Sequence, residues 1–299
     1  MKIIRPIAVT DSILTASNAL EDDTPAWAAP TAYTAGQFAH RPSLHKVFKC
    51  TANVTSATPP ETDTAHWQSY RATNKFAMFG QRMRSQTKVS DTLSVTITPT
   101  SRVDGLWMGN LAGARVRVQA GAVFDQQQRL IRRATTGWYS YLFGGFDIRR
   151  EAAFLGLPPL RYPITITVSQ PAGVIAAAGP TVLGSVIEIG GTMYGAAPGF
   201  KNFSQFAESE IDGSLVVTES DFALKPRISV LIKGDPISVA RKVDQVCYLM
   251  QDFRATPVVV IAGEGLYDCL TCYGYFESFE PVIEQKTHTI VQLTMRGLT

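Results

Sequence analysis

Three aromatic residues near the start of the chain have the types and spacing to bind a sugar: Trp27, Tyr33 and Trp67. Aromatic rings bind carbohydrate by stacking on the apolar face of a pyranose, which requires rings that share an exposed face. The same rings could instead pack together as a core, because roughly 40 residues bury little apolar area without large side chains. The sequence leaves both interpretations open, and the exposure of the rings distinguishes them.

Cys269 and Cys272 form a Cys-x-x-Cys pair, which is half of a zinc site or a redox pair. A structural zinc ion needs four ligands, and no second such pair and no pair of histidines accompanies these two. The pattern therefore favours small apolar residues on a strand, and we expect no metal and no cofactor. Four scattered cysteines in 299 residues also predict no disulfide framework, which is typical of a chain that matures in a reducing cytoplasm.

Glu208, Glu210 and Asp212 are carboxylates that could serve as the acid and base of a glycosidase. No nucleophile elbow, phosphate-binding loop or dinucleotide fingerprint occurs, and the four histidines lack the spacing of metal ligands. We therefore expect that the chain is not an enzyme.

The charge of the chain argues against two classes of partner. A formal net charge of +3 with 18% charged residues gives no basic field for nucleic acid. The most apolar stretch, residues 173–184, is interrupted by Gly179-Pro180 and is shorter than the roughly 20 residues of a bilayer span. We expect no nucleic-acid partner and no membrane insertion.

The first 72 residues predict an extended arm followed by a small β-module. Residues 1–20 alternate apolar and polar positions, and such an arm either pairs with another subunit as an assembly strand or packs on its own chain. Within residues 21–72, the short runs 37–39 and 46–52 have the length of strands and are bounded by turn residues. These features predict a small β-meander.

Residues 73–183 are expected to form an antiparallel β-sandwich. Apolar residues alternate with polar ones at 93–97, 115–118 and 164–168, the period of a half-buried strand. Residues 124–157 are rich in rings and arginines, including Trp138, Tyr139, Tyr141, Phe143, Phe146, Arg129, Arg132, Arg133, Arg149 and Arg150. Because the domain is nearly neutral, we interpret the rings as sandwich core and the arginines as a subunit contact, rather than as a nucleic-acid surface.

Residues 184–299 predict an α+β domain with one helix. Asp235 is a suitable N-cap, Pro236 takes the first helical position, and Pro257 ends the segment. Apolar residues share one face of this helix, namely Val239, Val243, Val246, Met250 and Phe253. Strands are expected at 228–232 and 258–262, with a hairpin made of 270–279 and 288–295. The whole chain is thus predicted to be mainly β.

The module resembles small carbohydrate-binding modules of the chitin-binding type. The matching residues are Ala26-Trp27, Tyr33-x-x-Gly36-x-x-Ala39, Phe48-x-Cys50-x-Ala52, Pro60 and Trp67. Glycan-binding versions usually display exposed rings after the second strand, where this chain has Asn53-Val54-Thr55. The resemblance implies sugar contact through Trp27, Tyr33 and Trp67, and the departure favours an adaptor that has kept the fold alone.

The chain also resembles a family of bacteriophage tail proteins in which such a module precedes a galactose-binding or jelly-roll-like β-sandwich. The segments that carry this resemblance are 74–79, 92–95, 104–118, 190–195 and 202–204. It implies a minor tail protein of the virion, at the tail tip or baseplate, made in the host cytoplasm and assembled as a homo-oligomeric ring or trimer. Its partners would be other tail proteins and a cell-surface glycan during host attachment. The alternative is a glycan-binding protein.

Overall fold

The computed structural model describes residues 1–55, 57–133, 137–159, 161–208, 215–218, 222–263 and 267–298. The chain forms two compact units, of which unit 1 contains residues 1–7 and 182–299 and unit 2 contains residues 8–181. Antiparallel strands make up most of the regular structure in both, so the predicted mainly β fold class is confirmed. The finer division at residues 20, 72 and 183 stays a prediction.

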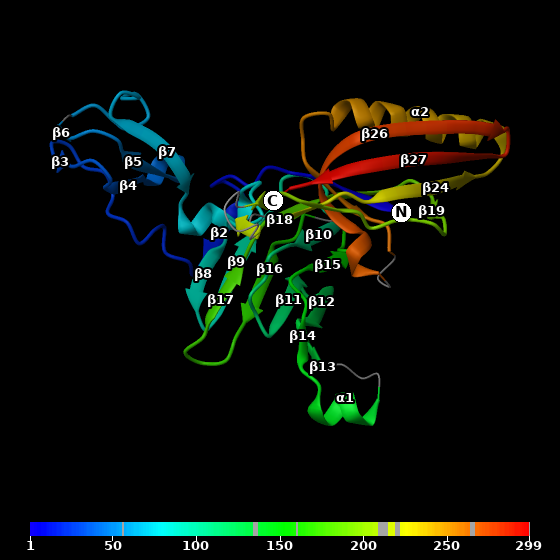
Figure 1. Ribbon diagram of the computed structural model, residues 1–299, viewed down its shortest axis with the longest axis horizontal. Coiled ribbons are helices and arrows are strands. Elements are labelled where there is room, and N and C mark those ends of the chain that lie inside the picture. The colour runs from blue at the N-terminus through cyan, green and yellow to red at the C-terminus, as the bar shows by residue number, and fades with distance from the viewer. Residues whose placement is uncertain are drawn as a thin grey trace. The chain divides into compact units, whose positions relative to one another are not determined.

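Unit 1 is built on an antiparallel sheet with the strand order β18-β1-β25-β26-β27-β24-β19 (Figure 1). These strands are β1 (Lys2–Pro6), β18 (Thr181–Glu188), β19 (Gly191–Thr192), β24 (Arg227–Lys233), β25 (Val258–Ile261), β26 (Thr271–Gln285) and β27 (His288–Gly297). The 3-10 helix η3 (Asp268–Leu270) leads into β26. Two short pairs complete the unit, β20 (Phe200–Asn202) with β23 (Phe222–Leu224) and β21 (Gln205–Glu208) with β22 (Leu215–Thr218).

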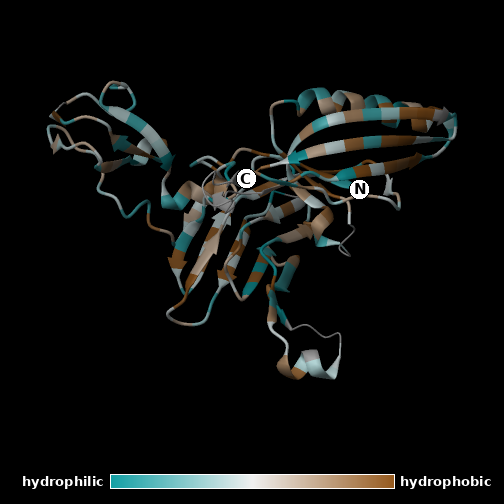
Figure 2. Ribbon diagram, in the orientation of Figure 1, coloured by the Kyte–Doolittle hydropathy of each residue, from teal (hydrophilic) through white to brown (hydrophobic). Residues whose placement is uncertain are grey.

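One helix, α2 (Pro236–Asp252), packs its apolar face on this sheet. Asp235 caps it, since its carboxylate accepts hydrogen bonds from the Ser238 backbone N–H at 3.1 Å and hydroxyl at 2.6 Å. The core between helix and sheet contains Val239, Val243, Val246, Leu249, Val230, Val260, Val291 and Leu293. The predicted helix and its cap are confirmed, and its predicted apolar face is buried except at Met250, which is half-buried, while Leu249 is buried instead. Figure 2 shows hydrophobic residues alternating along β24 and β27.

The strand β1 lies inside this sheet. Its residues pair with β18 on one edge and with β25 on the other, and Ile4 lies opposite both Val186 and Val259. Ile3 and Ile4 are both fully buried, although successive side chains of a strand point to opposite faces. The sequence left two possibilities for the amino-terminal arm, an assembly strand or packing on its own chain. The residues of β1 pack on their own chain.

Unit 2 contains a five-stranded antiparallel sheet with the order β12-β11-β16-β9-β2. Its strands are β2 (Leu14–Ser17), β9 (Thr92–Ile97), β11 (Arg115–Ala120), β12 (Phe124–Arg129) and β16 (Ile164–Ser169). Every second residue of β9, β11 and β16 is buried, as the alternation predicted. Two further pairs lie in the unit, β8 (Thr87–Ser90) with β17 (Ile175–Ala178) and β10 (Gly105–Met108) with β15 (Ala152–Leu155).

The predicted module corresponds to a three-stranded sheet and a short strand pair. The sheet has the order β4-β5-β7, formed by β4 (Phe38–Arg41), β5 (Lys46–Cys50) and β7 (Trp67–Ala72). The pair is β3 (Ala32–Tyr33) with β6 (Val54–Thr55). The 3-10 helix η1 (Pro42–Leu44) connects β4 to β5, and η2 (Asn74–Phe79) follows β7.

A hairpin arm extends the chain beyond β12. It consists of β13 (Ile131–Arg133), the short helix α1 (Trp138–Phe143) and β14 (Phe146–Ile148), and we call its described residues, 131–133 and 137–148, the aromatic arm. Its five rings are all exposed: Trp138, Tyr139, Tyr141, Phe143 and Phe146. The prediction that they form the sandwich core is therefore wrong. A two-stranded ribbon has no further layer of its own that could cover them.

Candidate binding and assembly surfaces

Tyr33 and Trp67 lie together inside the module. Their ring centroids are 4.9 Å apart in an edge-to-face arrangement, and the two residues are only 8% and 4% exposed. The Tyr33 hydroxyl accepts a hydrogen bond from the Ala28 backbone N–H at 3.0 Å. Ala39, Phe48 and Cys50 complete this small core. Two of the three predicted sugar-stacking rings therefore occupy the core, where no pyranose can reach their faces.

Trp27 is half-buried against the same core. The Arg41 guanidinium lies over its ring, 4.9 Å from the centroid, and also donates a hydrogen bond to Glu61 at 2.9 Å. Because Tyr33 and Trp67 are buried, Trp27 does not share an exposed platform with them.

The module does present another ring to solvent, that of Tyr70 on β7. The Tyr70 ring is inclined against that of half-buried Phe38, with centroids 5.0 Å apart. Tyr70 was not singled out from the sequence. The signal was weak, because the odd spacing of Trp67 and Tyr70 predicts opposite faces only in a regular strand, and a register shift between β5 and β7 falls at Tyr70.

An imidazole links the module to its neighbouring segments within unit 2. His45 Nδ1 lies 2.8 Å from a Glu21 oxygen and its Nε2 lies 2.6 Å from an Asp11 oxygen, while its ring stacks on Phe76. Desolvation opposes protonation of His45, but hydrogen bonds to the two carboxylates and their charges outweigh it and raise the pKa. The protonated ring donates to both acids, so this cluster acts as a charged clamp.

A buried carboxylate reinforces the same joint. The Asp22 side chain has no exposed area and accepts two hydrogen bonds from Arg71, at 2.7 and 3.0 Å. It also accepts from the backbone N–H groups of Thr24 and Asn74. Burial alone would raise the pKa of Asp22, yet these hydrogen bonds and the Arg71 charge lower it. The acidic turn at 21–23 is thus a structural connector.

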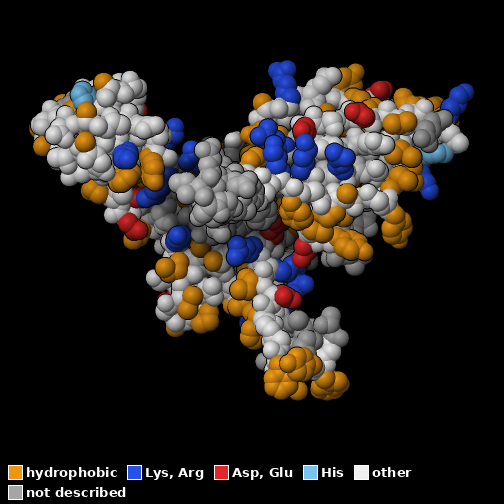
Figure 3. Space-filling view, in the orientation of Figure 1, with side chains coloured by type: hydrophobic (Ala, Val, Ile, Leu, Met, Phe, Trp, Pro, Cys, Tyr) orange, Lys and Arg blue, Asp and Glu red, His pale blue; other side chains and the backbone are white. Residues whose placement is uncertain are grey.

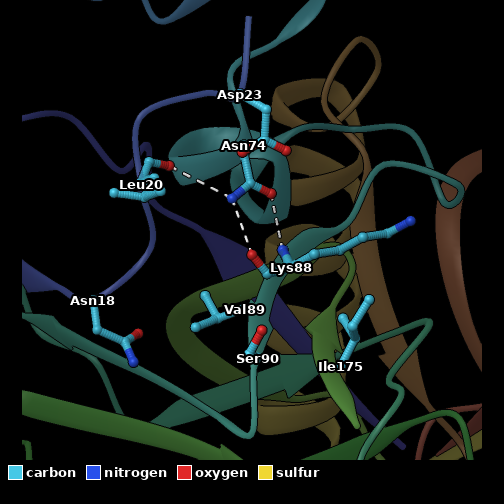
Figure 4. Close-up of a pocket in the computed structure, with 8 residues that line it drawn as sticks. All are labelled: Asn18, Leu20, Asp23, Asn74, Lys88, Val89, Ser90 and Ile175. Carbon is cyan, nitrogen blue, oxygen red and sulfur yellow. Dashed lines mark hydrogen bonds between the residues drawn. The ribbon is translucent and has the colours of Figure 1, made fainter. Parts of the chain in front are cut away.

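A groove of about 490 Å³ lies beside this joint (Figure 4). Asn74 forms one wall, where its side-chain amide donates to the Lys88 carbonyl at 3.0 Å and accepts from the Lys88 backbone N–H at 2.9 Å. Asn18 also lines the groove, with its amide bound to the backbone of β9. Because these amides already have partners, Asn74 holds the backbone of β8 and Asn18 that of β9, rather than receiving a ligand.

The aromatic arm is the largest exposed apolar feature that we find in the described parts of unit 2. Trp138, Tyr139 and Phe143 are 83%, 79% and 74% exposed, and Figure 3 shows hydrophobic side chains gathered at its tip. At its base, fully buried Leu130 anchors the arm, and its carbonyl accepts from the Arg149 N–H at 2.8 Å. A fixed base with a ring-covered tip is typical of a surface that another molecule covers.

The other residue types that could carry chemistry do not form a site in the described part of the chain. Cys269 is exposed in η3 and Cys272 is buried in β26. Glu210 and Asp212, together with the side chain of Glu208, lie outside the described residues. In the described part of the chain, no three His, Cys, Asp or Glu residues form a group that could hold a metal ion. Nor does any described helix have the length and apolar character to cross a membrane.

Comparisons with known proteins assign no family. The chain matches no protein-family model, and it has no significant similarity to a curated protein or to a solved structure.

Proposed function

We propose that this chain is a structural component of a bacteriophage tail, located at the tail tip or baseplate, which assembles with copies of itself and with other tail proteins. The sequence resemblance to tail proteins supplies the virion context. The two β-rich units supply rigid layers whose sheet edges and loops are available for contacts between subunits.

The exposed aromatic arm is the observation that carries the assembly part of the proposal. Trp, Tyr and Phe are enriched at the centres of protein interfaces, where they bury large areas at low entropic cost. An isolated chain leaves Trp138, Tyr139 and Phe143 in water. Exposing this apolar area to water costs free energy, and a neighbouring subunit that covers the rings removes that cost.

Mass spectrometry of phage particles tests the proposal directly. Particles are purified from a lysate of the source by density gradient, and peptides of this chain are quantified against the major capsid protein. A fixed, low ratio that survives the gradient is expected. Absence from the particles, with the protein left free in the lysate, would contradict a structural role.

Glycan binding by the module is the second candidate, and the exposed Tyr70 ring is the observation that favours it. The predicted platform of Trp27, Tyr33 and Trp67 receives no such support, because two of its rings are buried. Co-sedimentation with insoluble chitin compares Tyr70→Ala with the unchanged protein. Retention of the unchanged protein and loss of binding by Tyr70→Ala, without loss of thermal stability, would support this candidate. Equal binding by both would contradict it.

A further inference from the structure

Unit 1 contains an apolar pocket of about 470 Å³ between the loop after β19 and the segment that precedes β26. We call it the Tyr194 pocket, and its apolar lining includes Met193, Tyr194, Ala196, Pro198, Tyr267 and Leu270. Tyr194 is fully exposed and Tyr267 is largely so. The volume lies in the range of about 300–1,000 Å³ that is typical of sites for apolar groups.

Resting on the proposed assembly function, we infer that the aromatic arm of one copy docks into the Tyr194 pocket of a second copy. The arm offers rings without a covering layer, and the pocket offers an apolar hollow with two tyrosines at its rim. Both surfaces belong to the same chain. Each copy can therefore give one arm and receive another, which is a heterologous contact that propagates from copy to copy into a ring or a filament.

The rings of the arm supply more than half of the area that one side of such a contact needs. A buried aromatic side chain contributes about 150–250 Å², so the exposed fractions of Trp138, Tyr139, Phe143 and Phe146 amount to roughly 440–740 Å². A stable interface buries about 800 Å² on each partner. The arm rings thus supply the larger part of one side, and Leu142 and Ile148, which are also exposed, extend it.

One charge on each surface suits this docking, while the arm also carries Asp147 opposite Arg132. Arg132 is exposed on β13 of the arm, and Asp268 is exposed in η3, beside pocket residues Tyr267 and Cys269. Opposite charges at the rim of an apolar contact favour one orientation over others and accelerate encounter.

A mixing experiment with the full chain tests the inference. The arm variant carries Trp138→Ser, Tyr139→Ser and Phe143→Ser, and the pocket variant carries Tyr194→Ser and Pro198→Glu, all at exposed positions. Sedimentation equilibrium measures self-association. We expect association of the unchanged chain and at least about 30-fold weaker association of either variant alone.

A mixture of the two variants gives the distinctive result. The arm variant keeps an intact pocket and the pocket variant keeps an intact arm, so together they form one contact. We expect a one-to-one dimer that grows no further. A contact between two arms would give no such rescue. Unimpaired association of the pocket variant, or a mixture that stays monomeric, would overturn the inference.

Matched controls and a cross-link make the outcome specific. Val123→Ser on unit 2 and Tyr248→Ser on α2 remove equally exposed apolar groups outside both surfaces and should associate normally. In a Tyr139→Cys variant, a short thiol cross-linker should join residue 139 to native, exposed Cys269 of another copy. The Cys269→Ser change should abolish that product, whereas a cross-link formed within one chain would overturn the inference.

The result is separable from the test of the proposed function. A chain that is present in particles at a fixed ratio but stays monomeric in solution would keep its structural role and lose this self-contact. A chain that forms the predicted rings but is missing from particles would keep the contact and lose the phage-tail assignment.

Discussion

The module and the aromatic arm use the same residue types in opposite ways. Tyr33 and Trp67 pack on each other inside the module, whereas Trp138 and Phe143 lie in water at the tip of a ribbon. The module rings are enclosed by a three-stranded sheet and a strand pair, while the arm has two strands of three residues each. The number of layers around a ring, rather than its identity, therefore determines whether it stabilises the chain or is available to a partner.

Truncating one tryptophan in each region is the largest test of this comparison. Trp67→Ala should lower the free energy of unfolding of unit 2 by about 3–5 kcal/mol, because it leaves a cavity beside Tyr33. Trp138→Ala should change it by less than about 0.5 kcal/mol in the monomer, because the side chain is exposed. Chemical denaturation measures both. Equal losses would show that the arm is packed in solution.

Removing one carboxylate in each region gives a smaller difference. Asp22→Asn should cost about 2 kcal/mol, because charged hydrogen bonds to Arg71 and a backbone N–H are weakened at a buried position. Asp147→Asn, on the exposed arm strand β14 opposite Arg132, should cost about 0.5 kcal/mol or less. Thermal unfolding of the two variants is the measurement. An Asp22→Asn variant with unchanged thermal stability would refute the role of Asp22 as a connector.

The His45 clamp should make the module joint sensitive to pH. A pKa raised in the folded state means that folding favours the protonated imidazole, so the stabilisation is complete below the unfolded pKa, about 6.5. It is lost as the pH rises through the folded value. We expect the Tm of unit 2 to fall by on the order of 2 °C between pH 6 and pH 8.5. The His45→Gln variant should lack this step, and an identical profile for both proteins would exclude the clamp.

Tryptophan fluorescence provides the mildest test, because it changes no stability. Acrylamide should quench the emission of Trp138 efficiently, since Trp67 and Trp107 are buried and Trp27 is half-buried. The Trp138→Phe variant should therefore lose most of the readily quenched signal in the monomer. Retention of that signal would place a different ring at the surface.

The features that were predictable from the sequence depend on local patterns. The α2 helix has an Asp235 cap, a proline at its first position and a repeat of apolar residues, and all three act within a few residues. The strands β9, β11 and β16 were equally predictable, because apolar and polar residues alternate along them. These signals are local in sequence and do not depend on contacts with distant segments.

The features that were missed depend on distant contacts. The clamp joins His45 to Glu21 and Asp11 across separations of 24 and 34 residues, which no local spacing reveals. The prediction for the arm was wrong for a different reason, because large apolar residues are usually buried and five rings between Trp138 and Phe146 suggested a core. The adjacent Gly144-Gly145 and the absence of alternation were the available signs of an exposed turn.

The position of β1 in its sheet sets an order of events during synthesis. Ile4 pairs with Val186 and Val259, so this strand leaves the ribosome long before its partners exist. At about 5–20 residues per second, the interval before Val259 is made is on the order of 10 to 50 s. Unit 2, which is one continuous stretch of chain, can fold during that time. The edge of β1 that pairs with β25 must remain open meanwhile, so the apolar residues Ile3 and Ile4 are exposed to other contacts until β25 is made.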